Sequence, residues 1–464
     1  MMKRLTTLLL LVMALTLTAC GGPGENPENE TEPSAPQTAT AEPETEISKE
    51  MLAPFRKTAT IEETVLLDED GVRVTATGLE YTNHSADLKL TIENNSQQDL
   101  SVSSGSLVYG CNSINGMMAA DGYLNCDVSA GKKAMDAISF HEQTLQLCGI
   151  QEIANMELGL TVTDKNYDST NYPPKEIRTS AWSDAADGAN FQDTITGAAA
   201  QNTFEYEVLH FDAKRFYEES DMAILSQTLI RNAGGEQMLL LEAENQGDTM
   251  KVLSVGDIAL NGLVVEAGPW TRQLLTPGKR GILSVDLTAA LEGPYWELYG
   301  VDGVGSIQFT VQQYGMDGLP LGEKKSVEIV CGEEKTFDHS GELVYQENEA
   351  AILLKSVIEP EEGDGHYWNV MLLAENSGQE PLKLEIPFQT LSVNGFMVDN
   401  FGGHWELQAG QSAVMELRLD KTDLEEIGVT TADQITQMEF GLELRRGKTK
   451  VDDTTIQLTF NEKG

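Results

Sequence analysis

The sequence lacks the residue patterns that most catalytic and metal sites require. None of its five cysteines belongs to a Cys-x-x-Cys pair, and its six histidines are scattered singly, which argues against zinc ribbons and histidine metal sites. His141-Glu142 has no second histidine at zincin spacing, and no nucleophile elbow, dinucleotide fingerprint or phosphate loop occurs. We therefore predict no catalytic residues, no metal site and no cofactor, and a protein that is not an enzyme.

Basic residues are also scarce. The 464 residues include 31 Lys and Arg against 74 Asp and Glu, which gives a formal net charge of -43. So acidic a chain is soluble and repels nucleic acid, so we expect no nucleic-acid partner. The acidic run Asp68-Glu69-Asp70-Gly71 either binds calcium or forms a solvated hairpin turn. The turn is favoured because the run lacks the alternating ligand positions of an EF-hand loop.

The apolar run at the N-terminus, Leu8 to Leu17, is too short for a membrane-spanning helix. It follows Lys3 and Arg4 and leads into small residues and Cys20, which is the order of a secretory signal. The segment Leu17-Thr18-Ala19-Cys20 resembles the lipobox of a bacterial lipoprotein. The resemblance implies a signal peptide over residues 1–19, a diacylglyceryl group on Cys20, and anchoring on the extracytoplasmic face of the cell membrane.

Residues 20–58 are rich in Pro, Glu and Thr and have few large apolar side chains. Such a segment cannot bury enough apolar surface to offset the entropy of ordering it. We predict a disordered, acidic tether between the anchor and the folded part.

The rest of the chain contains the same landmarks three times in the same order. Each copy has an alternating apolar strand ending in Glu-Asn, an Asn-Gly turn, a glycine turn before another strand, a Gly-apolar pair, and a last alternating strand. These landmarks define repeat 1 (59–180), a divergent repeat 2 (203–331) and repeat 3 (342–464), separated by linkers at 181–202 and 332–341. The Glu-Asn pairs end at Asn94, Asn245 and Asn376, and the turns are Asn115-Gly116, Asn261-Gly262 and Asn394-Gly395.

About seven short strands per repeat, with turn signals every 8–12 residues, favour an antiparallel sandwich. One short helix per repeat is also expected, at His141 to Cys148, at Thr288 to Leu291, and from a capping-box pattern that starts at Thr422. We thus predict an all-β fold with three tandem immunoglobulin-like antiparallel β-sandwich domains.

The runs from Val65 to Glu80, Leu88 to Ser96 and Asp127 to Lys133 resemble the immunoglobulin-like repeat of uncharacterised lipoproteins from Firmicutes, clostridia especially. Those domains are similar in type to telokin-like extracellular modules of Gram-positive bacteria. The resemblance covers most of residues 60–180 and extends more weakly to 340–460. It implies an exported β-sandwich and no catalytic residues.

Two further sets of residues are candidates for local chemistry. Cys111 and Cys126 are 15 positions apart and could form a disulfide in an exported protein, and buried free thiols are the alternative. Trp270, Trp368 and Trp405 are candidate ligand-facing aromatics, and filling of the core is the alternative.

We expect a non-enzymatic surface lipoprotein that acts as a spacer or binds an unknown protein or glycan. Two other classes remain open. One is a solute- or glycan-binding lipoprotein that serves a transporter, and the other is a cell-envelope enzyme with an unrecognised site.

Overall fold

The computed structural model describes most of the chain after the N-terminal region. The described residues are 50–105, 111–183, 190–266, 271–291, 297–301, 303–359, 366–399 and 403–460. The predicted signal peptide, Cys20 and the tether up to residue 49 lie outside them. Residues 50–58, which were predicted to belong to the disordered tether, instead pack on repeat 1, where Phe55 is buried and the amide of Arg56 donates to the carbonyl oxygen of Gln151. The described chain is mostly β-strand with a few short helices, which confirms the all-β sandwich prediction.

Contacts divide the chain into two compact units rather than three. Among the described residues, the first comprises those within 50–236, 240–250 and 274–282, and the second comprises those within 237–239, 251–273 and 283–460. The division therefore runs through repeat 2. The organisation into three domains stays a prediction.

The first unit is built on two sheets. In the four-stranded sheet the order is β1 (Thr64–Glu69), β2 (Val72–Tyr81), β3 (Ser85–Asn94), β8 (Lys133–His141). The eleven-stranded sheet takes these strands from repeat 1: β4 (Leu100–Ser104), β5 (Ser113–Ile114), β6 (Met117–Met118), β7 (Leu124–Val128), β9 (Asn155–Asp164), β10 (Ser169–Arg178). It takes these from repeat 2: β11 (Tyr206–Asp212), β12 (Tyr217–Glu219), β13 (Met222–Asn232), β14 (Gln237–Asn245), β18 (Arg280–Asp286).

The second unit also has two sheets. The nine-stranded sheet takes these strands from repeat 2: β15 (Lys251–Leu260), β16 (Leu263–Glu266), β17 (Thr271–Leu275), β19 (Ser306–Tyr314), β20 (Pro320–Val330). It takes these from repeat 3: β21 (Glu342–Glu347), β22 (Ala350–Ile358), β23 (Tyr367–Asn376), β28 (Ser412–Asp420). The six-stranded sheet comprises β24 (Leu382–Ile386), β25 (Ser392–Val393), β26 (Phe396–Met397), β27 (Gly403–Leu407), β29 (Gln437–Arg446), β30 (Thr449–Thr459).

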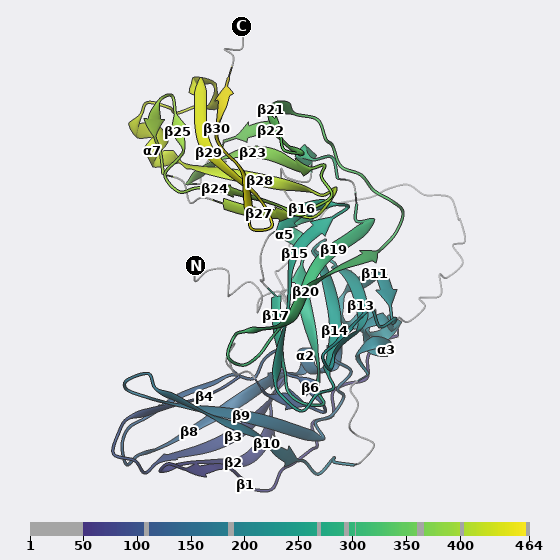
Figure 1. Ribbon diagram of the computed structural model, residues 1–464. Helices are drawn as coiled ribbons and strands as arrows, with labels where there is room; N and C mark the ends of the chain where they lie inside the picture. The colour runs from purple at the N-terminus through teal and green to yellow at the C-terminus, as the bar shows by residue number, and fades with distance from the viewer. Residues whose placement is uncertain are drawn as a thin grey trace, which may run out of the picture. The chain divides into compact units, whose positions relative to one another are not determined.

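Alternation of apolar and polar residues explains the layered core of the second unit. Val370, Leu372 and Ala374 point from β23 to one side, where they join one buried cluster with Leu442 and Leu444 of β29. Because alternate residues of a strand face opposite sides, each sheet presents one apolar face to the other. Figure 1 shows the two layers, with β22, β23 and β28 in one and β29 and β30 in the other.

The asparagine of each Glu-Asn pair closes its strand in the same way. The Nδ2 of Asn94 donates to the carbonyl oxygens of Gln98 and Val128, at 2.7 and 2.8 Å. Asn245 donates likewise to Thr249 and Leu275, and Asn376 to Glu380 and Leu407. All three asparagines are nearly inaccessible to solvent. The recurrence of Glu-Asn therefore reflects a buried amide that satisfies backbone groups.

The predicted Asn-Gly turns are confirmed by the backbone. The three asparagines have φ between 47° and 54° and the three glycines have φ between 80° and 84°. Such values at both positions are those of the hairpin turn that Asn-Gly favours. Each asparagine side chain also joins the turn to the loop before the last strand. The Oδ1 of Asn115, for example, accepts from the amides of Ala154 and Asn155.

Neighbouring repeats share sheets through one kind of strand pairing. We call the strand after the Asn-Gly turn the exit strand (β6, β16, β26) and the strand after the glycine turn the entry strand (β8, β18, β28). Exit strand β6 pairs in parallel with entry strand β18, and exit strand β16 pairs in parallel with entry strand β28. We call these pairings junction 1, which lies in the first unit, and junction 2, which lies in the second.

Both junctions use the same backbone hydrogen bond. The amide of Arg280 donates to the carbonyl oxygen of Gly116 at 3.0 Å, and the amide of Ser412 donates to that of Gly262 at 3.1 Å. In each case the donor is the first residue of the entry strand, and the acceptor is the glycine of the Asn-Gly turn. The sequence did not predict these short parallel pairings between strands of neighbouring repeats.

The helices are short and partly as expected. Helices α2 (Glu142–Leu147) and α5 (Thr288–Leu291) lie where they were predicted, and α7 (Lys421–Glu426) is capped by Asp420 rather than Thr422. The predicted linker 181–202 is not uniformly irregular, since it contains α3 (Phe191–Thr196) and the start of α4 (Ala198–Phe204). Phe191 and Ile195 are buried one helical turn apart, which explains the helix there. Among residues 332–341, by contrast, the structure has neither helix nor strand.

Candidate functional site

The candidate site with the clearest aromatic group is a depression of about 380 Å³ on the six-stranded sheet. Trp405 of β27 lies opposite Leu384 of β24, on the side of the sheet that faces the core. Because β27 is an edge strand, the indole is only partly buried. A Cβ at Gly403 would lie 2.3 Å from the ring, so glycine there leaves room for it.

Charged side chains complete the lining of this depression. Lys383 Nζ lies 3.1 Å from a carboxylate oxygen of Glu406, and Arg445 pairs with Glu443. Hydrogen bonds from Lys450 and then Arg445 lower the pKa of Glu443. A carboxyl group held ionised in this way is a poor general acid at neutral pH. These charged residues alternate along their strands with Leu384 and Trp405, so their side chains face the other side of the sheet from the indole. The arrangement offers charged hydrogen bonds, which is chemistry for binding. The lining residues are Lys383, Leu384, Glu385, His404, Trp405, Glu406, Glu443 and Arg445.

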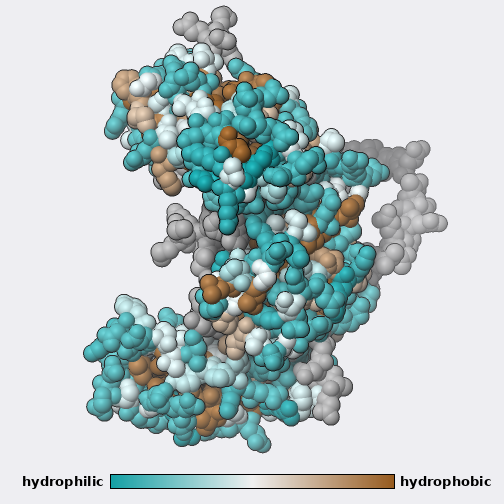
Figure 2. Space-filling view, in the orientation of Figure 1, coloured by the Kyte–Doolittle hydropathy of each residue, from teal (hydrophilic) through white to brown (hydrophobic). Residues whose placement is uncertain are grey.

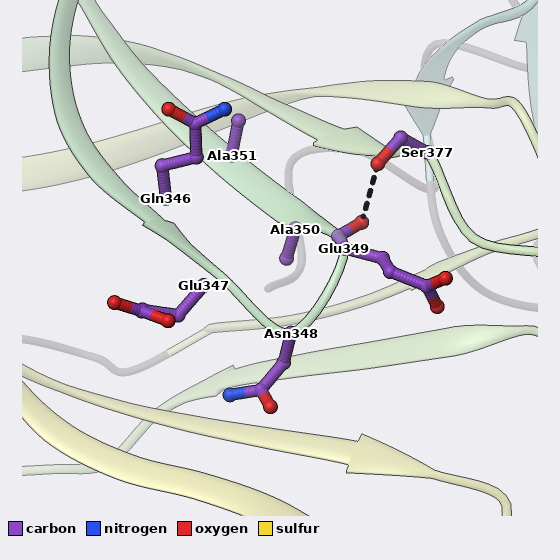
Figure 3. A pocket seen from close by; sticks show the side chains of 7 residues that line it. All are labelled: Gln346, Glu347, Asn348, Glu349, Ala350, Ala351 and Ser377. Atoms are coloured by element: carbon purple, nitrogen blue, oxygen red, sulfur yellow. Dashed lines mark hydrogen bonds between the residues drawn. The ribbon is translucent and has the colours of Figure 1, made fainter.

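A second depression, of about 300 Å³, lies at the turn between β21 and β22. Figure 3 shows its side chains, with a hydrogen bond from the Ser377 hydroxyl to the Glu349 carbonyl oxygen. Asn348 and Glu349 both have positive φ, so the depression is shaped by a tight hairpin turn. Its lining is polar, without an aromatic ring or a buried ionisable group.

The structure separates the three candidate tryptophans. Trp270 lies outside the described residues. Trp368 is only 2% exposed and belongs to the core of repeat 3, so it fills the interior instead of facing a ligand. Its place on β23, between two layers of a sandwich, explains the burial. Trp405 alone of the three lines a described depression.

The candidate disulfide between Cys111 and Cys126 is not formed, because both cysteines are free thiols. Cys111 packs against Gly159 of β9, whereas Cys126 lies on β7, and β4 separates these two strands. Two strand spacings are about 9.6 Å, which is beyond the reach of a disulfide. Burial raises the pKa of both thiols, so neither is a reactive thiolate.

The acidic run at Asp68 forms the expected hairpin turn between β1 and β2. Asp70 and Gly71 have φ of 52° and 79°, and Arg73 lies 3.3 Å from an oxygen of Asp68. The Tyr172 hydroxyl donates to Asp70, and desolvation together with that carboxylate raises the pKa of Tyr172 to about 12. Within the described ranges, no group of three or more His, Cys, Asp or Glu side chains is placed to hold a metal ion.

Membrane-spanning helices are absent from the part of the chain that the structure describes. On the face shown in Figure 2, hydrophobic residues form only small, separate areas on a mainly hydrophilic surface.

Sequence reasoning did not find the charged residues that line the depression on the six-stranded sheet, or the exposed exit strand of repeat 3. Lys383, His404 and Arg445 come from three strands, and no spacing in the sequence brings them together. Phe396 and Met397 follow the third Asn-Gly turn and are 57% and 62% exposed. The two apolar residues directly after the Asn-Gly turn were the available signal.

The comparisons with known proteins assign no family. No family model matches the chain, and no curated protein matches it. Among solved structures, a bacterial ice-binding adhesin involved in host cell surface retention matches with 11% identity and a TM-score of 0.14, over 80% of this chain and 90% of that one. A Bacteroides uniformis beta-glucuronidase matches with 15% identity and a TM-score of 0.16 over 48% of this chain. The chain spans 26% of that enzyme. Scores this low carry no argument on fold or function.

Proposed function

We propose that the protein is a lipid-anchored, extracytoplasmic, non-enzymatic protein that serves as a spacer or binds a protein or glycan. The lipobox-like segment ending at Cys20 supports the anchor, since a diacylglyceryl group supplies the two chains that stable attachment requires. The acidic segment before residue 50 supports a tether that holds the folded part away from the membrane.

Junctions 1 and 2 are the observation that carries the spacer function. Each joins strands of neighbouring repeats into one sheet by a backbone hydrogen bond, as between Ser412 and Gly262. Sheet hydrogen bonds fix the orientation of their partners more tightly than a flexible linker does. A spacer built in this way presents its outer loops and free edges to partners.

Fractionation of cells that make the full chain tests the anchor. We expect wild-type protein in the membrane fraction, labelled by radioactive palmitate, and Cys20→Ala protein unlabelled and released. Cys126→Ala is the matched control, because that cysteine is buried in the sandwich, and it should stay in the membrane fraction. Retention and labelling of the Cys20→Ala protein would contradict the proposal.

Glycan or solute binding at Trp405 is the second candidate function. It is favoured by the depression that Trp405, Lys383 and Arg445 line together, since cations in a depression orient the polar groups of a ligand. A panel of cell-envelope oligosaccharides provides the test. Trp405→Ala should remove any binding, whereas Tyr167→Ala, which alters an aromatic that is 89% exposed in repeat 1, should not. Equal binding by both variants would reject this site.

A further inference from the structure

The two ends of the repeat series carry complementary unpaired edges. Entry strand β8 of repeat 1 ends the four-stranded sheet, and exit strand β26 of repeat 3 ends the six-stranded sheet. Among the described strands, β8 pairs only with β3, and β26 pairs only with β25. Everywhere else an exit strand pairs with an entry strand. Among the described strands, one entry strand and one exit strand therefore have an unpaired edge.

Exposed apolar residues mark the unpaired exit strand. Phe396 and Met397 are 57% and 62% exposed. Their counterparts at the junctions are at most 4% exposed, and they are Met117, Met118, Leu263 and Val264. Removing two such apolar side chains from water is favourable. The exit strand of repeat 3 thus carries apolar residues like those that are buried at the two junctions, but it carries them on an exposed edge.

The unpaired entry strand presents the matching backbone donor. The amide of Asn94 donates to the carbonyl oxygen of Lys132, so these two residues face each other as a hydrogen-bonded pair. The next residue, Lys133, lies opposite Glu93 in the alternate position of the antiparallel ladder. Its amide therefore points away from β3, toward the free edge. Lys133 holds the position of Arg280 and Ser412, whose amides make the junction hydrogen bonds.

A side-chain pair recurs beside each junction hydrogen bond. At junction 1, Lys279 Nζ lies 2.5 Å from a carboxylate oxygen of Glu157. At junction 2, the side-chain Nε2 of Gln411 donates to the side-chain Oε1 of Gln308 at 2.5 Å. Lys279 and Gln411 directly precede the entry strand, and Glu157 and Gln308 lie on the last alternating strand beside the turn.

The same two positions at the free edges hold a lysine and a glutamate. Lys132 directly precedes entry strand β8, and it has no acidic partner among the ion pairs of the described residues. Glu439 lies opposite Ser392 on β29, just as Glu157 lies opposite Ser113 on β9. The free edges therefore repeat the Lys–Glu combination of junction 1.

We propose that the partner of the exit strand of repeat 3 is the entry strand of repeat 1 in a second copy of this chain. The amide of Lys133 in one copy donates to the carbonyl oxygen of Gly395 in the other. Phe396 then lies opposite Lys133, Met397 lies opposite Ala134, and Lys132 pairs with Glu439. Because the two surfaces differ, the association is head to tail and adds further copies unless it closes into a ring.

The outer face of repeat 1 makes this contact weaker than junction 2. Lys89 and Thr91 occupy the positions that Met371 and Leu373 hold in repeat 3, counting back from the strand-ending asparagines. The apolar cluster of junction 2, which contains Leu263, Met371 and Leu373, thus has no full equivalent. Met135, which is 87% exposed, is the apolar residue available to Phe396. We expect a concentration-dependent association with a dissociation constant of about 1 µM or weaker.

Sedimentation velocity of the full chain in mild detergent, from about 1 to 200 µM, measures this association. We expect the average mass to rise through dimers and larger species. Phe396→Lys places a charge on the pairing edge and should lower the association constant about tenfold or more. A chain that stays monomeric over this range contradicts the proposal. So does an association that Phe396→Lys leaves unchanged.

Charge reversal tests the predicted register. Lys132→Glu and Glu439→Lys should each weaken the association, and the double variant, which again pairs opposite charges, should restore it. Glu347→Lys makes the same charge change at an exposed site on β21 and is the control for net charge. Failure of the double variant to recover contradicts the Lys132–Glu439 pair.

Cross-linking between differently tagged copies tests which ends meet. A Lys132→Cys chain with one tag is mixed with a Glu439→Cys chain with another and oxidised. We expect a covalent dimer that carries both tags, since neither chain contains both introduced cysteines. Lys175→Cys, on exposed β10, replaces Lys132→Cys in the control mixture. Equal yields from the two mixtures overturn the head-to-tail arrangement.

Discussion

Junctions 1 and 2 share a backbone and differ in side-chain chemistry. Junction 1 lies beside Glu242, which is fully buried and pairs with Arg280 at 3.0 Å, and Gln192 donates to the same carboxylate. Junction 2 lies beside an apolar cluster around Tyr299 and Leu373, where the Tyr299 hydroxyl donates to the carbonyl oxygen of Leu372. The comparison indicates that strand pairing sets the register of neighbouring repeats, while different side chains stabilise it.

The largest expected effect is at the buried carboxylate of junction 1. Glu242→Ala leaves Arg280 without its buried partner and should lower the free energy of unfolding by about 3 to 5 kcal/mol. Glu244→Ala, two residues along β14, removes a partly exposed ion pair with Arg215 and should cost less than about 1 kcal/mol. Denaturant titration of the two variants measures the difference. Similar losses of unfolding free energy in the two variants would contradict a special contribution of the buried Glu242 to stability.

At junction 2 the corresponding change is the loss of apolar volume. Leu373→Ala opens a cavity where the side chain is fully buried and should cost about 3 kcal/mol. Leu343→Ala, at a position that is 52% exposed, is the control and should change stability by less than about 0.5 kcal/mol. The Leu373→Ala loss should be independent of salt. A loss of unfolding free energy that becomes smaller in high salt would contradict the apolar cluster, because it would show that charges contribute at this position.

The Asn-Gly turns offer a test that spans all three repeats. Replacing Asn115, Asn261 or Asn394 by Ala forces alanine into positive φ and removes backbone hydrogen bonds, at a cost of about 2 kcal/mol each. Asn115→Ala and Asn261→Ala should also speed the amide exchange of Arg280 and Ser412. Asn394→Ala should destabilise repeat 3, which contains Ser412, without speeding the amide exchange of Arg280 in repeat 2. Acceleration of the Arg280 amide by Asn394→Ala contradicts the assignment.

The polar pairs at the junction rims should give small and distinguishable effects. Lys279→Ala removes the ion pair with Glu157 and should cost less than about 1 kcal/mol, most of it lost in 1 M salt. Gln411→Ala removes an uncharged pair, and its effect should not depend on salt. Calorimetry at low and high ionic strength compares the two. An equal salt dependence would contradict the assigned chemistry.

The smallest effect is expected at His141, on entry strand β8. A hydrogen bond from its ring to Asp121 raises the pKa of His141 above its ordinary value of 6.5. A raised pKa stabilises the folded state below the unfolded pKa, and this contribution is lost as the pH rises through the folded pKa. The stability difference between wild type and His141→Gln should therefore shrink from pH 6 to pH 9. A difference that grows with pH contradicts this.

The sequence was a good guide to local structure. The structure has the Asn-Gly turns, the strand-ending asparagines and helices α2 and α5 where they were predicted. These features were predictable because turn geometry and alternation depend on residues that are close together in the sequence. Helix α3 was missed because Phe191 and Ile195 lie in a segment whose Ala, Asp and Gly content is typical of a linker.

Contacts between distant residues were much less predictable. Junction 1 is a single pair of residues, Met117 and Arg280, and so short a pairing leaves no periodic signal. Trp368 and Trp405 both adjoin loops in the sequence, and only the position of their strands in the sandwich decides that one is buried and the other lines a depression.

Hydrogen–deuterium exchange of three amides in the full chain tests the shared backbone of the junctions most directly. The amides of Arg280 and Ser412 pair with the preceding exit strand, whereas Lys133, at the equivalent position in repeat 1, begins a strand that pairs only with β3 among the described strands. In dilute solution we expect Arg280 and Ser412 to exchange about a hundredfold more slowly than Lys133. Exchange of Arg280 and Ser412 as fast as Lys133 would contradict the junctions themselves.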